Sequence, residues 1–208
     1  SAVTDMDEAF LNRATFNENI SGWDVSNVTN LRMMFHGATV FNQPIGNWNT
    51  SKVTTTYATF REAASFNQPI GFWDMSKVKF MGFMFAKATA FNQPIGNWDI
   101  STAVSAVGMF DKATSFNQAI GNWNTSSVTD MRWMFLQASA FNQPIGNWNV
   151  SNVIEMGDMF KGATSFNQPI GFWNTSSVTG MSRMFHYSPS FNQYLGNWNV
   201  SQVIEMQE

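Results

Sequence analysis

The chain has 208 residues, a formal net charge of −3 and no cysteine, and 15% of its residues are aromatic whereas only 12% are charged. This weakly acidic balance gives no electrostatic basis for binding nucleic acid or an anionic membrane. The absence of cysteine excludes disulfides, thiol nucleophiles and thiolate metal sites. No apolar run approaches the ~20 residues of a transmembrane helix, so we expect no membrane insertion of this fragment.

A repeat of 25 residues runs through the chain. Phe occupies position 1 of the repeat, Trp position 8 and a second Phe position 20, and the consensus is FNQPIGNW(N/D)xSxVTxMxxMFxxATS. A period of this size is typical of a solenoid, and it is too short for a propeller blade of about 40 residues. The sequence predicts one repeat domain, 1–208, with a partial helical segment 1–15 and coils at 16–40, 41–65, 66–90, 91–115, 116–140, 141–165, 166–190 and, in part, 191–208.

Within each repeat, the expected local structure changes along the chain. FNQPI and W(N/D)xS are predicted to be short extended segments joined by a turn, because Pro at position 4 and Gly at position 6 oppose a helix. Apolar residues then follow at positions 13, 16, 19, 20 and 23, such as Val128, Met131, Met134, Phe135 and Ala138. This spacing predicts one face of a short helix. We therefore expect an α/β solenoid, a right-handed stack of eight 25-residue coils.

Residues 162–185, GATSFNQPIGFWNTSSVTGMSRMF, carry a resemblance to a known family. They are similar to the repeat of BspA-like leucine-rich-repeat surface proteins, a bacterial surface-protein repeat of about 26 residues. The resemblance covers essentially the whole chain and implies a leucine-rich-repeat-like solenoid on a secreted or surface-anchored protein. It therefore implies an extracellular or cell-surface location. In this chain Phe, Met and Trp replace the leucines, and position 23, often Cys in such repeats, is Ala or Ser188.

Three polar positions are kept in all eight repeats: Asn at position 2, Asn or Asp at position 9 and Ser at position 11. One interpretation makes these rows ligand-binding ladders. The other, which we favour, is that each side chain satisfies backbone groups at the corners of its own and the next coil. The same corners contain Asn-x-Ser sequons, which are therefore weak evidence of glycosylation.

The sequence offers no catalytic constellation. His36 and His186 lie six repeats apart, about 29 Å at the usual strand spacing, so they cannot share a metal or a proton. Asp130 and Glu155 fall on adjacent coils, but acids in the first turn of a helix are favoured by its dipole. We expect no enzyme activity, no catalytic residue, no cofactor and no metal.

Aromatic residues outside the columns mark the candidate contact surface. Tyr57, Phe80 and Phe83 fall on adjacent coils, and Met33 and Trp133 share position 18 with Phe83. A cluster of exposed aromatics suggests a protein contact. The alternative is local packing over a weak coil, because Thr56 and Thr59 replace core methionines there, and we expect this coil to be the softest. Four further aromatic residues break the pattern without being assigned a role: Phe72, Phe172, Tyr187 and Tyr194.

Two functions follow as hypotheses. The first is a non-catalytic repeat module of a surface or secreted protein that binds a protein or glycan partner, in adhesion or recognition, through an extended face. The second is a structural spacer or self-assembling array with no specific ligand and with end-to-end self-association. Ice binding through Thr and Asn rows is disfavoured, because Thr at position 14 is replaced in four coils, by Lys79, Val104, Ile154 and Ile204.

Overall fold

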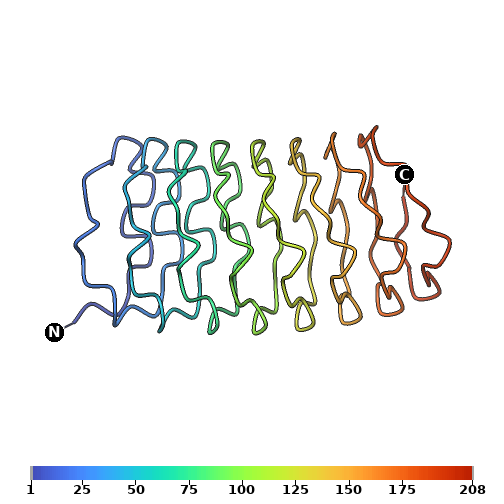
Figure 1. Cartoon of the computed structure of the whole chain (residues 1–208), viewed down its shortest axis with the longest axis horizontal. Helices are drawn as coiled ribbons and strands as arrows, with labels where there is room; N and C mark the ends of the chain where they lie inside the picture. The colour runs from blue at the N-terminus through green and yellow to red at the C-terminus, as the bar shows by residue number, and fades with distance from the viewer. Residues whose placement is uncertain (1, 208) are drawn as a thin grey trace.

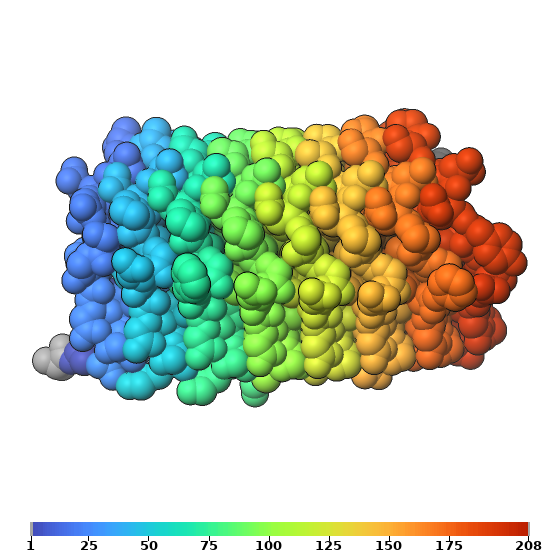
Figure 2. Space-filling model, viewed as in Figure 1, coloured from blue at the N-terminus to red at the C-terminus, as the bar shows by residue number. Residues whose placement is uncertain are grey.

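The computed structural model describes residues 2–207 and shows successive coils of one repeat each, stacked into a straight rod (Figure 1). The two ends of the chain lie at opposite ends of the rod, and the coils are in unbroken contact along the face shown in Figure 2. The predicted domain 1–208 includes residues 1 and 208, and the predicted helical segment 1–15 includes residue 1. These two residues lie outside the described residues. The assignment of one domain stays a prediction.

Residues 2–207 contain no helix, and their only strand-like pairing consists of isolated parallel bridges between neighbouring coils. The prediction of an α/β solenoid with a short helix in every coil is therefore wrong, and so is the helical segment 1–15. One residue per coil, always at position 15, takes part in the bridges: Asp5, Asn30, Thr55, Phe80, Ser105, Asp130, Glu155, Gly180 and Glu205.

The segment expected to be helical alternates between two kinds of backbone hydrogen bond. Amides at positions 16, 18, 20 and 22 donate to the next coil, as Phe35 N does to Thr59 O at 2.9 Å. Amides at positions 19, 21 and 23 donate three residues back in the same coil, as Ala38 N does to Phe35 O at 3.0 Å. Positions 18 and 22 are left-handed, for example Met33 with φ of 50°. A helix needs φ near −63° throughout and bonds to the fourth residue back, so this backbone cannot be helical.

The close stacking of aromatic rings explains why helices do not fit. Phe rings at position 20 lie 5.5 to 5.7 Å from those of the next coil. Trp rings at position 8 stack at 6.2 to 6.5 Å. Packed helices need about 8–10 Å between their axes. A helix in every coil would therefore push the coils apart and separate the rings.

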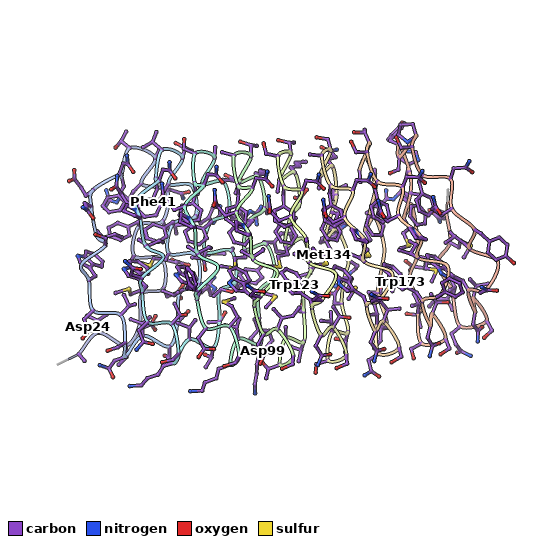
Figure 3. All side chains as sticks on the ribbon, in the orientation of Figure 1. Asp24, Phe41, Asp99, Trp123, Met134 and Trp173 are labelled. Carbon is purple, nitrogen blue, oxygen red and sulfur yellow. The ribbon has the colours of Figure 1, made fainter. Side chains whose placement is uncertain are left out.

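The core is a set of columns that run along the rod. Phe at positions 1 and 20, Trp at position 8, Ile at position 5 and Met at positions 16 and 19 all point inward, as the labelled Phe41, Trp123 and Trp173 show (Figure 3). The Trp column is buried in the interior coils, where Trp48 to Trp173 are 2 to 4% exposed. Each stacked ring pair adds about 0.5–1.5 kcal/mol beyond burial.

The polar ladders hold the corners of the coils, as the hydrogen-bond interpretation predicts. Asn17 Oδ1 accepts from the backbone N of Asn42 at 2.9 Å and from Gln43 Nε2 at 3.0 Å, and the same contacts recur in later coils. Asp24 Oδ1 accepts from Ser26 N at 3.0 Å, which is repeated at position 9 of every coil. These side chains are therefore occupied by the fold itself.

Candidate functional site

Three of the five candidate contact residues form a row along the rod, which we call the aromatic row: Tyr57, Phe83 and Trp133. The Tyr57 and Phe83 rings meet edge to face with centroids 5.9 Å apart. The Phe83 and Trp133 rings lie 6.2 Å apart although a whole coil separates them. The row is partly exposed, with Trp133 at 37% and the other two intermediate. The row thus joins residues from three coils into one surface.

Glycines make room for the row. The Phe83 ring lies over Gly108, where an added Cβ would come within 2.5 Å of Phe83 Cδ1. The Tyr57 ring lies over Gly82, where a Cβ would lie 3.3 Å from Tyr57 Cε2. Because glycine has no side chain at these positions, each ring can pack against the backbone of the next coil. Part of each ring is therefore used in local packing.

The side chains of the other two candidates take no part in the ring contacts of the row. Phe80 is 51% exposed and lies at the bridge between Thr55 and Ser105, and its ring stacks on no other aromatic ring within residues 2–207. Met33 lies at position 18 of an earlier coil, in the left-handed conformation, and is half-buried. The structure therefore groups Tyr57, Phe83 and Trp133 and leaves Phe80 and Met33 as separate neighbours.

Cations flank the aromatic row. The Arg61 guanidinium lies 5.4 Å from the centroid of Phe83, and that of Arg132 lies 5.7 Å from Trp133. Both distances are within the range of a cation–π interaction. Arg132 is held in addition by Asp130, with Nη2 2.7 Å from Oδ2. The surface around the row therefore combines aromatic rings with guanidinium groups.

A small hollow of about 280 Å³ adjoins the far end of the row. Asp158, which is 6% exposed, lines it and accepts a hydrogen bond from Trp133 Nε1 at 3.3 Å. Arg183 and Lys161 pair with the same carboxylate at 3.0 and 3.3 Å. The Asp158 carboxylate is therefore paired with Arg183 and Lys161, and that of Asp130 with Arg132, so these two acids serve as structural ion pairs.

One carboxylate lies in a different environment. Burial raises the pKa of Asp111, and the nearby Lys112, Lys87 and Arg61 oppose this shift. Its Oδ1 is buried and makes no hydrogen bond with any residue of the described chain. At position 21 the equivalent residues in adjacent coils are Ala86 and Leu136. Asp111 is thus an acid flanked by apolar residues at the same position of the two adjacent coils.

A second surface was missed by the sequence reasoning. Phe72 and Phe172, both at position 7, are 92% and 87% exposed. They line two adjoining hollows of about 430 and 650 Å³ along the Pro–Gly turns, which we call the edge groove. The available signal was the replacement of Asn by Phe at position 7 in only two repeats.

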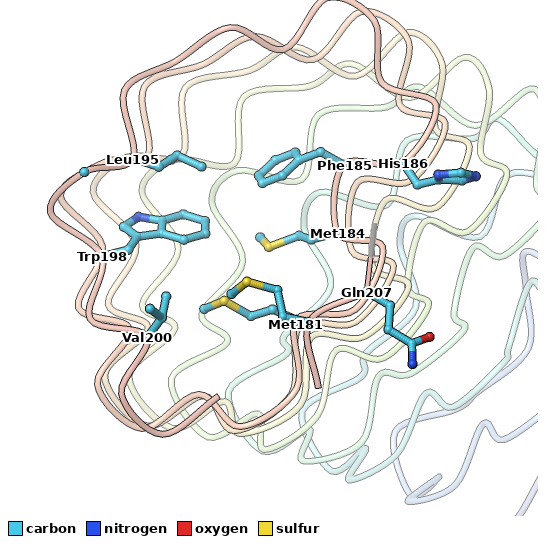
Figure 4. A pocket seen from close by; sticks show the side chains of 10 residues that line it. Met181, Met184, Phe185, His186, Leu195, Trp198, Val200 and Gln207 are labelled. Carbon is cyan, nitrogen blue, oxygen red and sulfur yellow. The ribbon is translucent and has the colours of Figure 1, made fainter. Parts of the chain in front are cut away.

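A third hollow lies at the end of the rod nearest the C-terminus. It measures about 590 Å³, and Met181, Met184, Phe185 and Trp198 point into it (Figure 4). These residues belong to the core columns, and here no further coil of the described chain covers them. The hollow is an exposed section through the core.

Within residues 2–207 no three His, Asp or Glu side chains gather as metal ligands would. The same residues include no helix that could cross a membrane.

Burial lowers the pKa of His36, and the neighbouring Arg61 adds to this effect. His36 and His186 occupy the same position of distant coils, as the sequence indicates.

Comparison with protein-family models gives one match, which covers residues 4–123 and 104–208 in two overlapping segments. The matching family is described as Mycoplasma protein of unknown function, DUF285. The two overlapping matches reflect the internal repeat. No curated protein is similar enough in sequence to give a match. Because the family model covers nearly the whole chain, this protein belongs to the DUF285 family of repeat proteins.

Proposed function

We propose that the chain is a non-catalytic binding module that contacts a protein partner through the aromatic row. The observation that carries the proposal is the contact between Tyr57, Phe83 and Trp133, which arise from three different coils and leave part of their rings exposed. Binding hot spots are enriched in Trp, Tyr and Arg. The guanidinium groups of Arg61 and Arg132 beside the rings supply the third residue type.

We further propose a relation to BspA-like surface proteins, and hence a secreted or cell-surface location. The support is the pair of sequence blocks MxxMFxxA and FNQxIxxW(N/D)xS, which recur together along the chain. A module on a cell surface would use its row in adhesion or recognition. The other class of partner for such a module is a glycan.

The test is a binding screen of the purified chain against an array of extracellular proteins, followed by calorimetry on each hit. The test variant changes Tyr57, Phe83 and Trp133 to Ser. The matched control changes Tyr187, which is 73% exposed and takes no part in the ring contacts of the row, to Ser. We expect the triple variant to lose binding by about tenfold or more, since each lost hot spot costs at least about 1 kcal/mol.

The circular dichroism spectra of both variants should match that of the unchanged chain. A folded triple variant that binds every hit with unchanged affinity would contradict the use of the row. An array with no hit would contradict the binding function itself.

The alternative is a structural spacer or self-assembling array. The apolar hollow lined by Met181 and Trp198 supports it, because a second copy of the chain would cover these residues by adding its first coil to the stack. Exposed apolar patches of this kind favour association. The measurement is molecular mass by sedimentation over a wide range of concentration. A mass that stays monomeric throughout contradicts self-association, whereas a rise that Trp198→Ser abolishes supports it.

A further inference from the structure

The edge groove runs along one edge of the rod, between two exposed rings. Position 7 reads Phe72, Asn97, Asn122, Asn147 and Phe172 in five consecutive coils. Phe72 lines one hollow and Phe172 the other. Ala119 and Asn122 line both, so the hollows adjoin at the coil midway between the rings. At the usual strand spacing, four coils span about 20 Å.

The floor of the groove is mainly backbone. Gly at position 6 packs against the carbonyl oxygen of position 4 in the next coil, and a Cβ at Gly71 or Gly146 would lie 2.6 Å from that oxygen. A side chain would therefore separate the coils and fill the groove. Ala119 stands where five other coils have Pro, and it lines both hollows. The result is a pair of adjoining hollows along the turns.

The two Phe rings contribute nothing to the core. They are 92% and 87% exposed, and neither stacks on another ring of the described chain. Single exposed apolar residues are ordinary on protein surfaces. Here, however, both occur at the same position of the repeat, where five other coils carry Asn, and both border the groove. Their shared placement points to a ligand that covers apolar ring faces.

The Asn side-chain amides between the Phe72 and Phe172 rings are available to a ligand. Asn97, Asn122 and Asn147 make no side-chain hydrogen bond with any residue of the part of the chain described, and all three line the groove. An amide both donates and accepts, as a sugar hydroxyl does. No charged residue in 2–207 lines either hollow, so the groove favours an uncharged ligand.

We propose that the edge groove binds a neutral, linear glycan laid along the rod, with its end sugars on Phe72 and Phe172. Amides recur once per coil, a spacing of about 4.8 Å, so an extended oligosaccharide with roughly one sugar per coil matches them. The rings cover the apolar faces of sugars at each end, and the amides bond hydroxyl groups in between. This surface is separate from the aromatic row, and the inference is independent of the function proposed for the row.

The experiment titrates the 208-residue chain by calorimetry with neutral linear oligosaccharides of glucose and of N-acetylglucosamine. Acidic oligosaccharides, sialylated or sulfated, and a proline-rich peptide are titrated in parallel. We expect binding of at least one neutral oligosaccharide and weaker binding of the acidic ones. No neutral binding at millimolar concentration, or binding of the peptide alone, would overturn the proposal.

Variants then locate the site. Phe72→Asn together with Phe172→Asn installs the residue that other coils carry at position 7, so the fold should be kept, and affinity should fall about tenfold. Asn122→Ala should weaken binding roughly threefold through a lost hydrogen bond. Its matched control, Asn47→Ala, changes the same position one coil beyond Phe72 and should leave affinity unchanged. Equal affinity in all four proteins would place the glycan elsewhere and refute the inference.

Variants of the aromatic row separate the two hypotheses. Changing Tyr57 and Phe83 to Ser should leave glycan affinity unchanged, because these residues do not line the groove. If this variant loses the glycan while Phe72→Asn with Phe172→Asn retains it, the row is the glycan site and the edge groove is not.

Discussion

Thr56 carries a buried hydroxyl without a partner. Its side chain is 0% exposed, and Oγ1 makes no hydrogen bond with any residue in 2–207. Thr59 is also 0% exposed, but its Oγ1 lies 2.9 Å from both Leu31 O and Thr56 O, so its one hydroxyl proton has an acceptor. Both threonines stand where most coils have Met. A comparison of Thr56 with Thr59 therefore tests how much the hydrogen bond of a buried hydroxyl contributes to stability, because the two side chains are equally buried.

We expect Thr56→Val to stabilise the protein. An unpaired buried hydroxyl costs about 1–3 kcal/mol, and Val keeps the branched shape while removing it. We expect a gain of about 1–2 kcal/mol in the free energy of unfolding, which corresponds to roughly 2–4 °C in Tm per kcal/mol for a chain of this size. Thr59→Val breaks a satisfied hydrogen bond and should lose about 0.5–1.5 kcal/mol.

The assay is urea unfolding followed by tryptophan fluorescence and circular dichroism, on the unchanged chain and both variants. The slopes of the transitions must agree, because stacked repeats can unfold in segments and a changed slope would mark a changed unfolding unit. A Thr56→Val variant no more stable than the unchanged chain would refute the reasoning. Equal gains from both variants would show that apolar burial alone matters.

Further predictions concern the core, the charge and the turns. Phe110→Ala removes a fully buried ring and should cost about 3–5 kcal/mol in urea unfolding, whereas Phe172→Asn should change stability by less than about 0.5 kcal/mol; equal losses would contradict the column core. Burial raises the pKa of Asp111 in the folded state. As pH rises through the unfolded and then the folded pKa of Asp111, the folded state therefore loses stability relative to the unfolded state. Asp111→Asn should therefore raise Tm at pH 7 and have no such effect below the unfolded pKa of about 3.9; a gain that does not vary with pH would count against this. A Cβ at Gly121 would meet a carbonyl oxygen of the next coil, whereas one at Gly22 would meet nothing within 4 Å. Thermal unfolding should show Gly121→Ala to be destabilised by about 1–3 kcal/mol and Gly22→Ala to be nearly unchanged; similar Tm values for the two would argue against the close approach of the turns.

The candidate site could be predicted only in part. Tyr57 and Phe83 fall on adjacent coils and similar positions, so their contact follows from the repeat. The contact of Phe83 with Trp133 does not, because it requires the ring to lie along the rod over Gly108. Likewise, the sequence treats Thr56 and Thr59 as equivalent losses of Met, and only the hydrogen bonds of Thr59 distinguish them. Side-chain direction is set by neighbouring coils, which a single repeat does not contain.

The period of 25 residues by itself determined which residues of successive coils stack on one another. Thin coils cannot enclose a core alone, so like residues must stack, and the Phe, Trp and Met columns and the Asn corners follow from the repeat. Tertiary structure decided the local backbone. Apolar residues three apart suit a helix and also successive turns that bond three residues back. The choice between them was made by ring columns spaced at 5.5 to 6.5 Å, because at that distance every second amide reaches the next coil and no helix fits.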